Sequence, residues 1–187
     1  MKKVISALVL TMGLSAGAMA KEVAGVKIDD SIKTTTGASL TLNGAGIREK
    51  WMFDVYVGGL YLPSKSADAA KIINSDEPMA IKLHMLRNVS GEKMVNATKE
   101  GFVNATHGNT GAIESEINKF LAVFGEEASE NNQYDMVYVP GKGVEVYVNG
   151  ELTDTISGGL EFKKALFGIW LSDQPAQEDL KKDMLGG

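Results

Sequence analysis

The sequence predicts an α+β fold, an antiparallel sheet that carries a layer of helices on one face. Residues 38–62 have the composition of two long strands, and residues 134–156 that of a three-strand meander. Segments with a helical spacing of apolar residues lie between these regions and after the second one. Because strands and helices come in blocks, the pattern favours α+β over a parallel α/β fold.

Residues 1–20 precede the predicted domain and have the pattern of an export signal. Lys2 and Lys3 come before an apolar run too short to cross a bilayer, and residues 18–20 match a signal peptidase site. We therefore predict a signal peptide over residues 1–20 and one domain over residues 21–187, with an uncleaved membrane anchor as the alternative. The lack of cysteine favours a bacterial periplasm, and no later segment is apolar enough to span a membrane.

The composition narrows the classes of partner. Without Lys2 and Lys3, 17 basic residues face 24 acidic ones, a net charge of −7, so we expect no nucleic acid partner. With no cysteine, and only His84 and His107 as histidines, we expect no metal. No phosphate-loop or dinucleotide-binding motif occurs, so we expect no cofactor.

The first block is strand-rich. Residues 22–28 predict one short strand, and residues 38–62 predict two antiparallel strands with a turn in "REKW". Four glycines interrupt the two long strands: Gly44, Gly46, Gly58 and Gly59. Glycine weakens a strand, so these positions indicate bulges or places where another part of the chain packs closely.

The central block alternates helix and strand. Residues 66–77 predict a short helix capped by Ser66, and residues 79–87 a strand whose polar residues Lys82 and His84 share one face. Ser90 is the expected cap of the next helix, and Gly125 is expected to end the helix after it.

The last block begins with the meander over residues 134–156. Its second turn is Asn149-Gly150, the strongest short signal of a two-residue hairpin. Residues 159–171 predict a helix, and Asp173 with Pro175 predicts the start of a final one. Helices over a curved sheet predict a ligand cleft between the two layers.

Four segments together resemble the bacterial chalcone-isomerase-like family. They are "LNGAGIREKWMFDVYVGGLYL", "YVPGKGVEVYVNGE", "FKKALFGIWLSDQP" and "DLKKDML", which occur in the family's order between about Val23 and Leu185. The resemblance implies the chalcone isomerase fold, an open-faced β-sandwich with a helical layer. The family includes plant enzymes that close a flavanone ring, relatives that bind fatty acids in the same cleft, and homologues that assist other enzymes.

The resemblance also implies site residues. In "GAGIR", Arg48 stands where both the catalytic and the fatty-acid-binding branches place an arginine that meets a ligand oxygen. The other plant positions are replaced: Tyr56 stands for a threonine, Lys93 for a tyrosine and Ile169 for a late threonine, while Glu100 stands near an asparagine. These replacements speak against chalcone cyclisation.

The candidate ligand-binding residues are Arg48, Tyr56, Tyr61 and Lys93. A guanidinium is always charged and binds a carboxylate with two hydrogen bonds, and the tyrosine hydroxyls can share that carboxylate. The alternatives are a local ion pair for Arg48, core roles for the tyrosines and a solvated helix face for Lys93. Tyr56 and Tyr61 have opposite parity, so a regular strand would place them on opposite faces.

Three functions are compatible with these observations. The first is non-catalytic binding of a small apolar carboxylate, fatty-acid-like or aromatic, with Arg48 at its anionic head. The second is an isomerase or intramolecular lyase acting on an enone-like substrate, with Tyr56 or Lys93 as acid or base. The third is an envelope interaction protein that binds a partner through the open face of the sheet.

Overall fold

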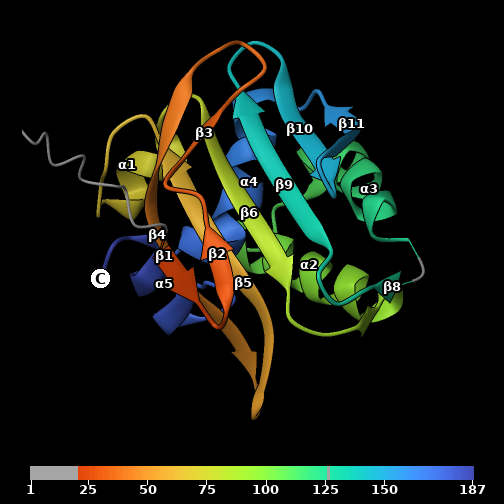
Figure 1. The fold of residues 1–187 in the computed structure, drawn as a ribbon. Helices are drawn as coiled ribbons and strands as arrows, with labels where there is room; N and C mark the ends of the chain where they lie inside the picture. Colours follow the sequence, from red (N-terminus) through yellow and green to blue (C-terminus); the bar gives the residue numbers. More distant parts are fainter. Residues whose placement is uncertain (1–20, 126) are drawn as a thin grey trace, which may run out of the picture.

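The computed structural model describes residues 21–125 and 127–187, so the predicted signal peptide lies outside the described residues. A curled seven-stranded antiparallel sheet forms the centre of the fold, in the order β11-β10-β9-β6-β5-β4-β3 (Figure 1). Its strands are β3 (Ser31–Lys33), β4 (Ser39–Lys50), β5 (Phe53–Leu62), β6 (Met79–Met85), β9 (Gln133–Val139), β10 (Gly143–Val148) and β11 (Glu151–Ile156). The predicted α+β class is confirmed.

Helices pack against one face of this sheet (Figure 1). They are α1 (Ala69–Asn74), α2 (Gly91–Ala105), α3 (Glu114–Leu121), α4 (Gly159–Leu171) and α5 (Glu178–Met184), with short 3₁₀ turns at Gly111–Ile113 and Ala122–Phe124. A two-stranded ladder of β7 (Val89–Ser90) and β8 (Glu127–Ala128) joins the start of α2 to the segment after α3. Among the described residues, none of the helices is long and apolar enough to cross a membrane.

Buried side chains fill the space between sheet and helices. Along α4, Phe162, Leu166 and Phe167 are fully buried, and the inward residues of β5, β6, β9 and β10 meet them. Aromatic contacts tie the layers together, with Phe102 of α2 stacked on Phe162 at 5.8 Å between ring centroids. The expected cleft between the layers is therefore occupied by the core in this structure.

A smaller cluster covers the opposite face of the sheet. The hairpin of β1 (Lys21–Val23) and β2 (Val26–Ile28) lies over strands β4, β5 and β6 (Figure 1). Leu40, Val57, Tyr61 and Ala80 are buried on this face. We call it the open face, because no helix of the described residues packs there.

Several predicted elements are confirmed and others are wrong at their ends. Ser90 accepts a hydrogen bond from Lys93 N as the cap of α2, and Asn149-Gly150 forms the β10–β11 turn with positive φ at both residues. The single strand over residues 22–28 is instead a hairpin, because Ala24 and Gly25 adopt positive φ.

Three other element boundaries also differ from the prediction. Asp68, not Ser66, caps α1, since the Asp68 carboxylate accepts from Lys71 N at 2.9 Å. Strand β4 continues to Lys50, so the turn moves from "REKW" to residues 51–52. The final helix begins at Glu178 and not at Asp173, because residues 173–177 form the loop that turns the chain back toward β4.

Two of the four glycines allow α5 to pack on β4. A methyl group at Gly44 would lie 2.0 Å from the Asp183 carbonyl oxygen, and one at Gly46 would lie 2.2 Å from the Asp183 carboxylate. Asn43 also joins β4 to the end of α5, since its side-chain amide donates to Met184 O at 2.8 Å. The "GAG" segment is thus the part of β4 against which α5 packs.

Lys163 is a fully buried cation on α4. Its ammonium donates to the carbonyl oxygens of Ile72, Ile73 and Ser75 at 2.7–2.9 Å, at the C-terminal end of α1. Burial lowers the pKa of Lys163 to about 8, and the negative charge of Asp76 partly opposes this shift. The lysine therefore joins α4 to α1 by satisfying carbonyls that a helix end leaves open.

Glu145 of β10 is a fully buried anion on the open face of the sheet, opposite the helical layer. Its carboxylate accepts hydrogen bonds from Lys142, Tyr147 and Thr35. Burial alone would raise the pKa of Glu145, but these hydrogen bonds outweigh it and hold the pKa below its usual value. The interaction fixes the Thr35 loop to the meander.

Candidate functional site

Arg48 lies near the end of β4, directly opposite Tyr56 of β5 in the strand register. Cross-strand partners of this kind project from the same face of a sheet. Tyr56 belongs to the core on the helical side, so Arg48 stands on that side as well, at its margin. The structure thus brings these two predicted site residues together.

The partners of Arg48 are neutral. Its Nη1 donates to the backbone oxygen of Glu49 and to Oε1 of Gln177 at 3.1 Å. Gln177, the residue before α5, also accepts from Glu49 N at 2.8 Å. Among the residues that the structure describes, Arg48 forms no ion pair. Arg48, half-buried as a residue, therefore keeps a positive charge with no acidic partner among the described residues.

Tyr56 connects Arg48 to the core. Its side chain is 8% exposed, and its hydroxyl accepts a 2.9 Å hydrogen bond from Nε1 of Trp170 on α4. Burial raises the pKa of Tyr56, which the Trp170 hydrogen bond and the Arg48 charge only partly offset. The hydroxyl is protonated at neutral pH, so it can donate to a ligand oxygen. We call Arg48, Tyr56, Trp170 and Gln177 the Arg48 cluster.

Two predicted site residues lie apart from the Arg48 cluster. Tyr61 is buried on the open face, where its hydroxyl donates to Asp29 O at 3.0 Å. This is the opposite face from Tyr56, as their parity on β5 predicts. Lys93 is exposed in the first turn of α2, and no hydrogen bond or ion pair joins its side chain to the Arg48 cluster in the described part of the chain.

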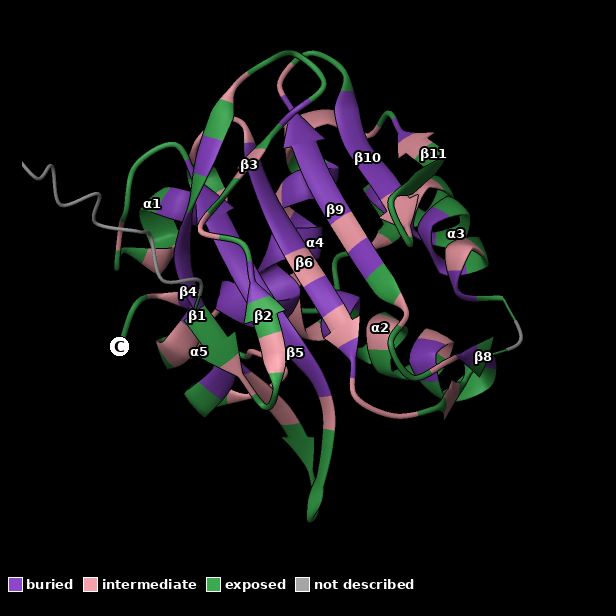
Figure 2. Ribbon diagram, viewed as in Figure 1, coloured by how far each residue is buried: buried purple, intermediate pink, exposed green. Residues whose placement is uncertain are grey.

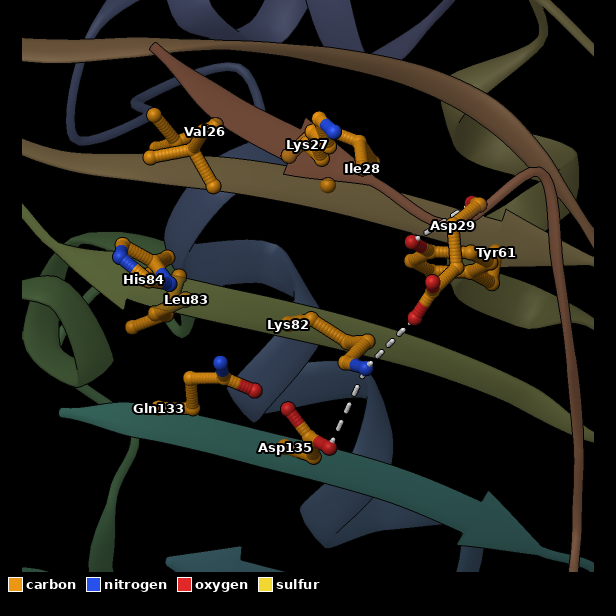
Figure 3. Close-up of a pocket in the computed structure, with 12 residues that line it drawn as sticks. Val26, Lys27, Ile28, Asp29, Tyr61, Lys82, Leu83, His84, Gln133 and Asp135 are labelled. Atoms are coloured by element: carbon orange, nitrogen blue, oxygen red, sulfur yellow. Dashed lines mark hydrogen bonds and ion pairs between the residues drawn. The ribbon is translucent and has the colours of Figure 1, made fainter. Parts of the chain in front are cut away.

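A pocket of about 190 Å³ lies on the open face, beneath the β1–β2 hairpin (Figure 3). Lys82 stands at its centre, 3.6 Å from Asp29 and 3.5 Å from Asp135. His84 and Gln133 complete its polar wall. This pocket is separated from the Arg48 cluster by the sheet, so it does not form a continuation of that site.

Asp135 is the unusual residue of this pocket. Its Oδ1 is buried and, among the described residues, has no hydrogen-bond partner. Burial raises the pKa of Asp135, although the charge of Lys82 and a hydrogen bond from it oppose the shift. Two carboxylates, of Asp29 and Asp135, and two ammonium groups, of Lys27 and Lys82, line the pocket, so their formal charges cancel.

Sequence reasoning did not include three of these residues among the candidates. Trp170 lies in a predicted helix, where its apolar neighbours suggest only a core role. Gln177 reaches Arg48 across 129 residues of sequence and follows no recognisable motif. Asp135 interrupts the apolar strand "YDMVYV", and this polar residue within a buried strand was the available signal.

Comparisons with known proteins agree with this architecture. The sequence profile of the chalcone isomerase-like family matches residues 20–186. A solved structure of a fatty-acid binding protein from Arabidopsis thaliana is similar, with a TM-score of 0.65, 17% sequence identity, and coverage of 83% of this chain and 95% of that chain. No curated protein sequence matches. The profile match spans nearly the whole described chain, and the chain therefore belongs to the chalcone isomerase-like family.

Proposed function

We propose that this protein binds a small apolar carboxylate, fatty-acid-like or aromatic, with Arg48 contacting the carboxylate. The observation that carries the proposal is the half-buried Arg48, whose guanidinium has neutral partners only among the described residues. A cation with incomplete solvation gains most from an anion that brings its own charge. The Tyr56 hydroxyl stands opposite Arg48 in the register and supplies a second donor to the same carboxylate.

The apolar part of the ligand would extend from Arg48 into the space between sheet and helices. That space is filled in this structure, so a ligand must displace core side chains. Five of those side chains are methionines, whose flexible thioethers repack at low cost: Met79, Met85, Met94, Met136 and Met184. Each buried methylene of the ligand contributes about 0.8 kcal/mol, so an acyl chain offsets a substantial repacking cost.

The likeness to the Arabidopsis fatty-acid binding protein supports this choice of ligand class. The arrangement favours binding over isomerase chemistry. Tyr56 is held protonated beside Arg48, which suits hydrogen-bond donation and not proton abstraction. Lys93, the other candidate base, is exposed on α2.

The test compares two ligands that differ only in the head group, dodecanoate and dodecanol, by isothermal titration calorimetry. We expect the wild type to bind dodecanoate at least about tenfold more tightly, as a charge-assisted hydrogen bond predicts. Arg48→Gln should lose this preference. Arg87→Gln is the matched control, because it removes the only other arginine of the chain and should keep the preference.

Equal binding of both ligands by the wild type would refute the anion contact, as would an unchanged preference in Arg48→Gln.

We further propose export to the bacterial periplasm. Amino-terminal sequencing of the protein from an osmotic-shock fraction should begin at Lys21, and retention of residues 1–20 would refute cleavage.

A further inference from the structure

The turn between β4 and β5 exposes three large apolar side chains in a row. Trp51 is 94% exposed, Met52 86% and Phe53 52%. The hairpin projects beyond the body of the protein, and its end belongs to the exposed class (Figures 1 and 2). We call these three residues the hairpin tip. The other large exposed apolar residues among those described, Val103 and Leu152, are single.

The geometry of the turn does not require these residue types. Trp51 adopts φ +64°, a left-handed conformation that favours glycine or asparagine. The same chain builds its β10–β11 turn from Asn149 and Gly150, which suit positive φ. A tryptophan with positive φ and almost no contact with the body adds nothing to folding. Its aromatic surface is therefore available for an external partner.

The charges around the hairpin tip indicate which partner. Lys50 precedes the tip, and the Arg87 guanidinium lies 4.2 Å from the centre of the Phe53 ring. With Arg48, these cations outnumber Glu49 and Asp54 by one, although the chain as a whole carries −5. Tryptophan and phenylalanine beside lysine and arginine are typical of segments that sit at the boundary of acyl chains and anionic headgroups.

We propose that the hairpin tip inserts reversibly into a lipid surface that contains anionic headgroups. Trp51, Met52 and Phe53 would enter the acyl boundary, while Lys50 and Arg87 contact the headgroups. Three side chains give shallow insertion, so binding is reversible. This inference goes beyond the proposed function and does not depend on it, because it requires no ligand at Arg48. If both hold, the Arg48 cluster stands at the base of the inserted hairpin.

The experiment measures co-sedimentation with large vesicles of equal parts phosphatidylethanolamine and phosphatidylglycerol, and with vesicles of phosphatidylcholine alone. We expect binding to the anionic vesicles and much weaker binding to the neutral ones. The double variant Trp51→Ser/Phe53→Ser should bind at least about tenfold less tightly, since burial of one such side chain is worth that factor or more. Val103→Ser/Leu152→Ser is the matched control and should bind like the wild type.

Tryptophan fluorescence gives a second readout. The chain has two tryptophans, of which Trp51 is 94% and Trp170 5% exposed, so a blue shift on addition of anionic vesicles reports Trp51. Trp51→Phe should lose the shift but keep most of the sedimentation. If the wild-type protein stays in the supernatant and shows no blue shift, the proposal is overturned. A protein partner is then the alternative for the hairpin tip.

The two proposals fail separately. The double variant at the hairpin tip should bind dodecanoate like the wild type in the absence of vesicles. If it binds vesicles like the wild type, the lipid proposal is refuted while the Arg48 contact stands.

Discussion

Replacing Gly44 by alanine tests whether the close approach of α5 to β4 holds the fold together. The added methyl carbon would lie 2.0 Å from Asp183 O and 2.9 Å from Met184 O, both of them backbone atoms that cannot rotate away. Gly58→Ala is the matched control, because its nearest neighbour is the Leu180 side chain at 3.6 Å, an ordinary contact. Gly44 of β4 is opposite Leu60 and Gly58 of β5 is opposite Gly46, so both glycines lie in the same pair of strands and differ in what faces them.

The magnitude follows from what α5 contributes when it is docked. Leu180 is 1% exposed and Met184 is fully buried, and burial of each contributes about 1.5–3 kcal/mol. The hydrogen bond from Asn43 to Met184 O adds about 1 kcal/mol. If α5 undocks, it regains chain entropy, which offsets part of these losses. The strain that the added methyl group causes cannot cost more than undocking α5, because the helix would then detach. We expect Gly44→Ala to lose about 3 kcal/mol of unfolding free energy.

Urea unfolding followed by circular dichroism measures this loss, and amide hydrogen exchange over residues 178–184 locates it. Gly58→Ala should stay within about 0.5 kcal/mol of the wild type or gain slightly from a less flexible unfolded chain. If Gly44→Ala unfolds at the same urea concentration as Gly58→Ala, with protected amides in α5, the contact does not stabilise the fold as the geometry implies.

Three further predictions concern buried polar groups. Because burial lowers the pKa of Lys163, the folded state releases this proton at a lower pH than the unfolded state does. The unfolding free energy of the wild type, relative to that of Lys163→Met, should therefore rise by up to about 3 kcal/mol between pH 8 and 10.5. Urea midpoints of the two proteins that stay parallel across this range would contradict the prediction. The pKa of Glu145 is held low, so Glu145→Gln should cost about 2 kcal/mol of unfolding free energy at pH 7. This difference should disappear as the pH falls through that lowered pKa, which thermal unfolding at pH 7 and in acid measures. A loss that is constant with pH would argue against a paired carboxylate. Tyr56→Phe leaves the Trp170 indole N–H unpaired and should cost about 1–2 kcal/mol; a double-mutant cycle with Trp170→Phe should show coupling, and additive losses would exclude it.

Local patterns predicted the sheet well. The alternation over residues 38–62, the Asn149-Gly150 turn and the Ser90 cap are encoded by neighbours in sequence, and the structure confirms them. Element ends were harder to predict. The final helix starts five residues later than Asp173 and Pro175 suggest, because its position is set by docking on Gly44 and not by its own start signals.

The candidate site was predictable only in part. Arg48 and Tyr56 stand out by residue type and by resemblance, and strand parity separated Tyr61 from Tyr56. Gln177 and Trp170 could not be assigned, since each reaches the site from a helix or loop more than 100 residues away. Whether Arg48 meets a ligand stays a prediction.

The contact of α5 with β4 also bears on the order of folding. Asn43 and Met184 are 141 positions apart, and Arg48 and Gln177 are 129 apart. Closing loops of this length is slow compared with pairing neighbouring strands, so the β4–β5 pair and the β9-β10-β11 meander should form early and α5 should dock late. A chain that lacks residues 177–187 should therefore still build its sheet, with Gly44 and Gly46 facing water and Arg48 without its amide partner. The candidate site around Arg48 should therefore be completed only after α5 has been synthesised and has docked on β4.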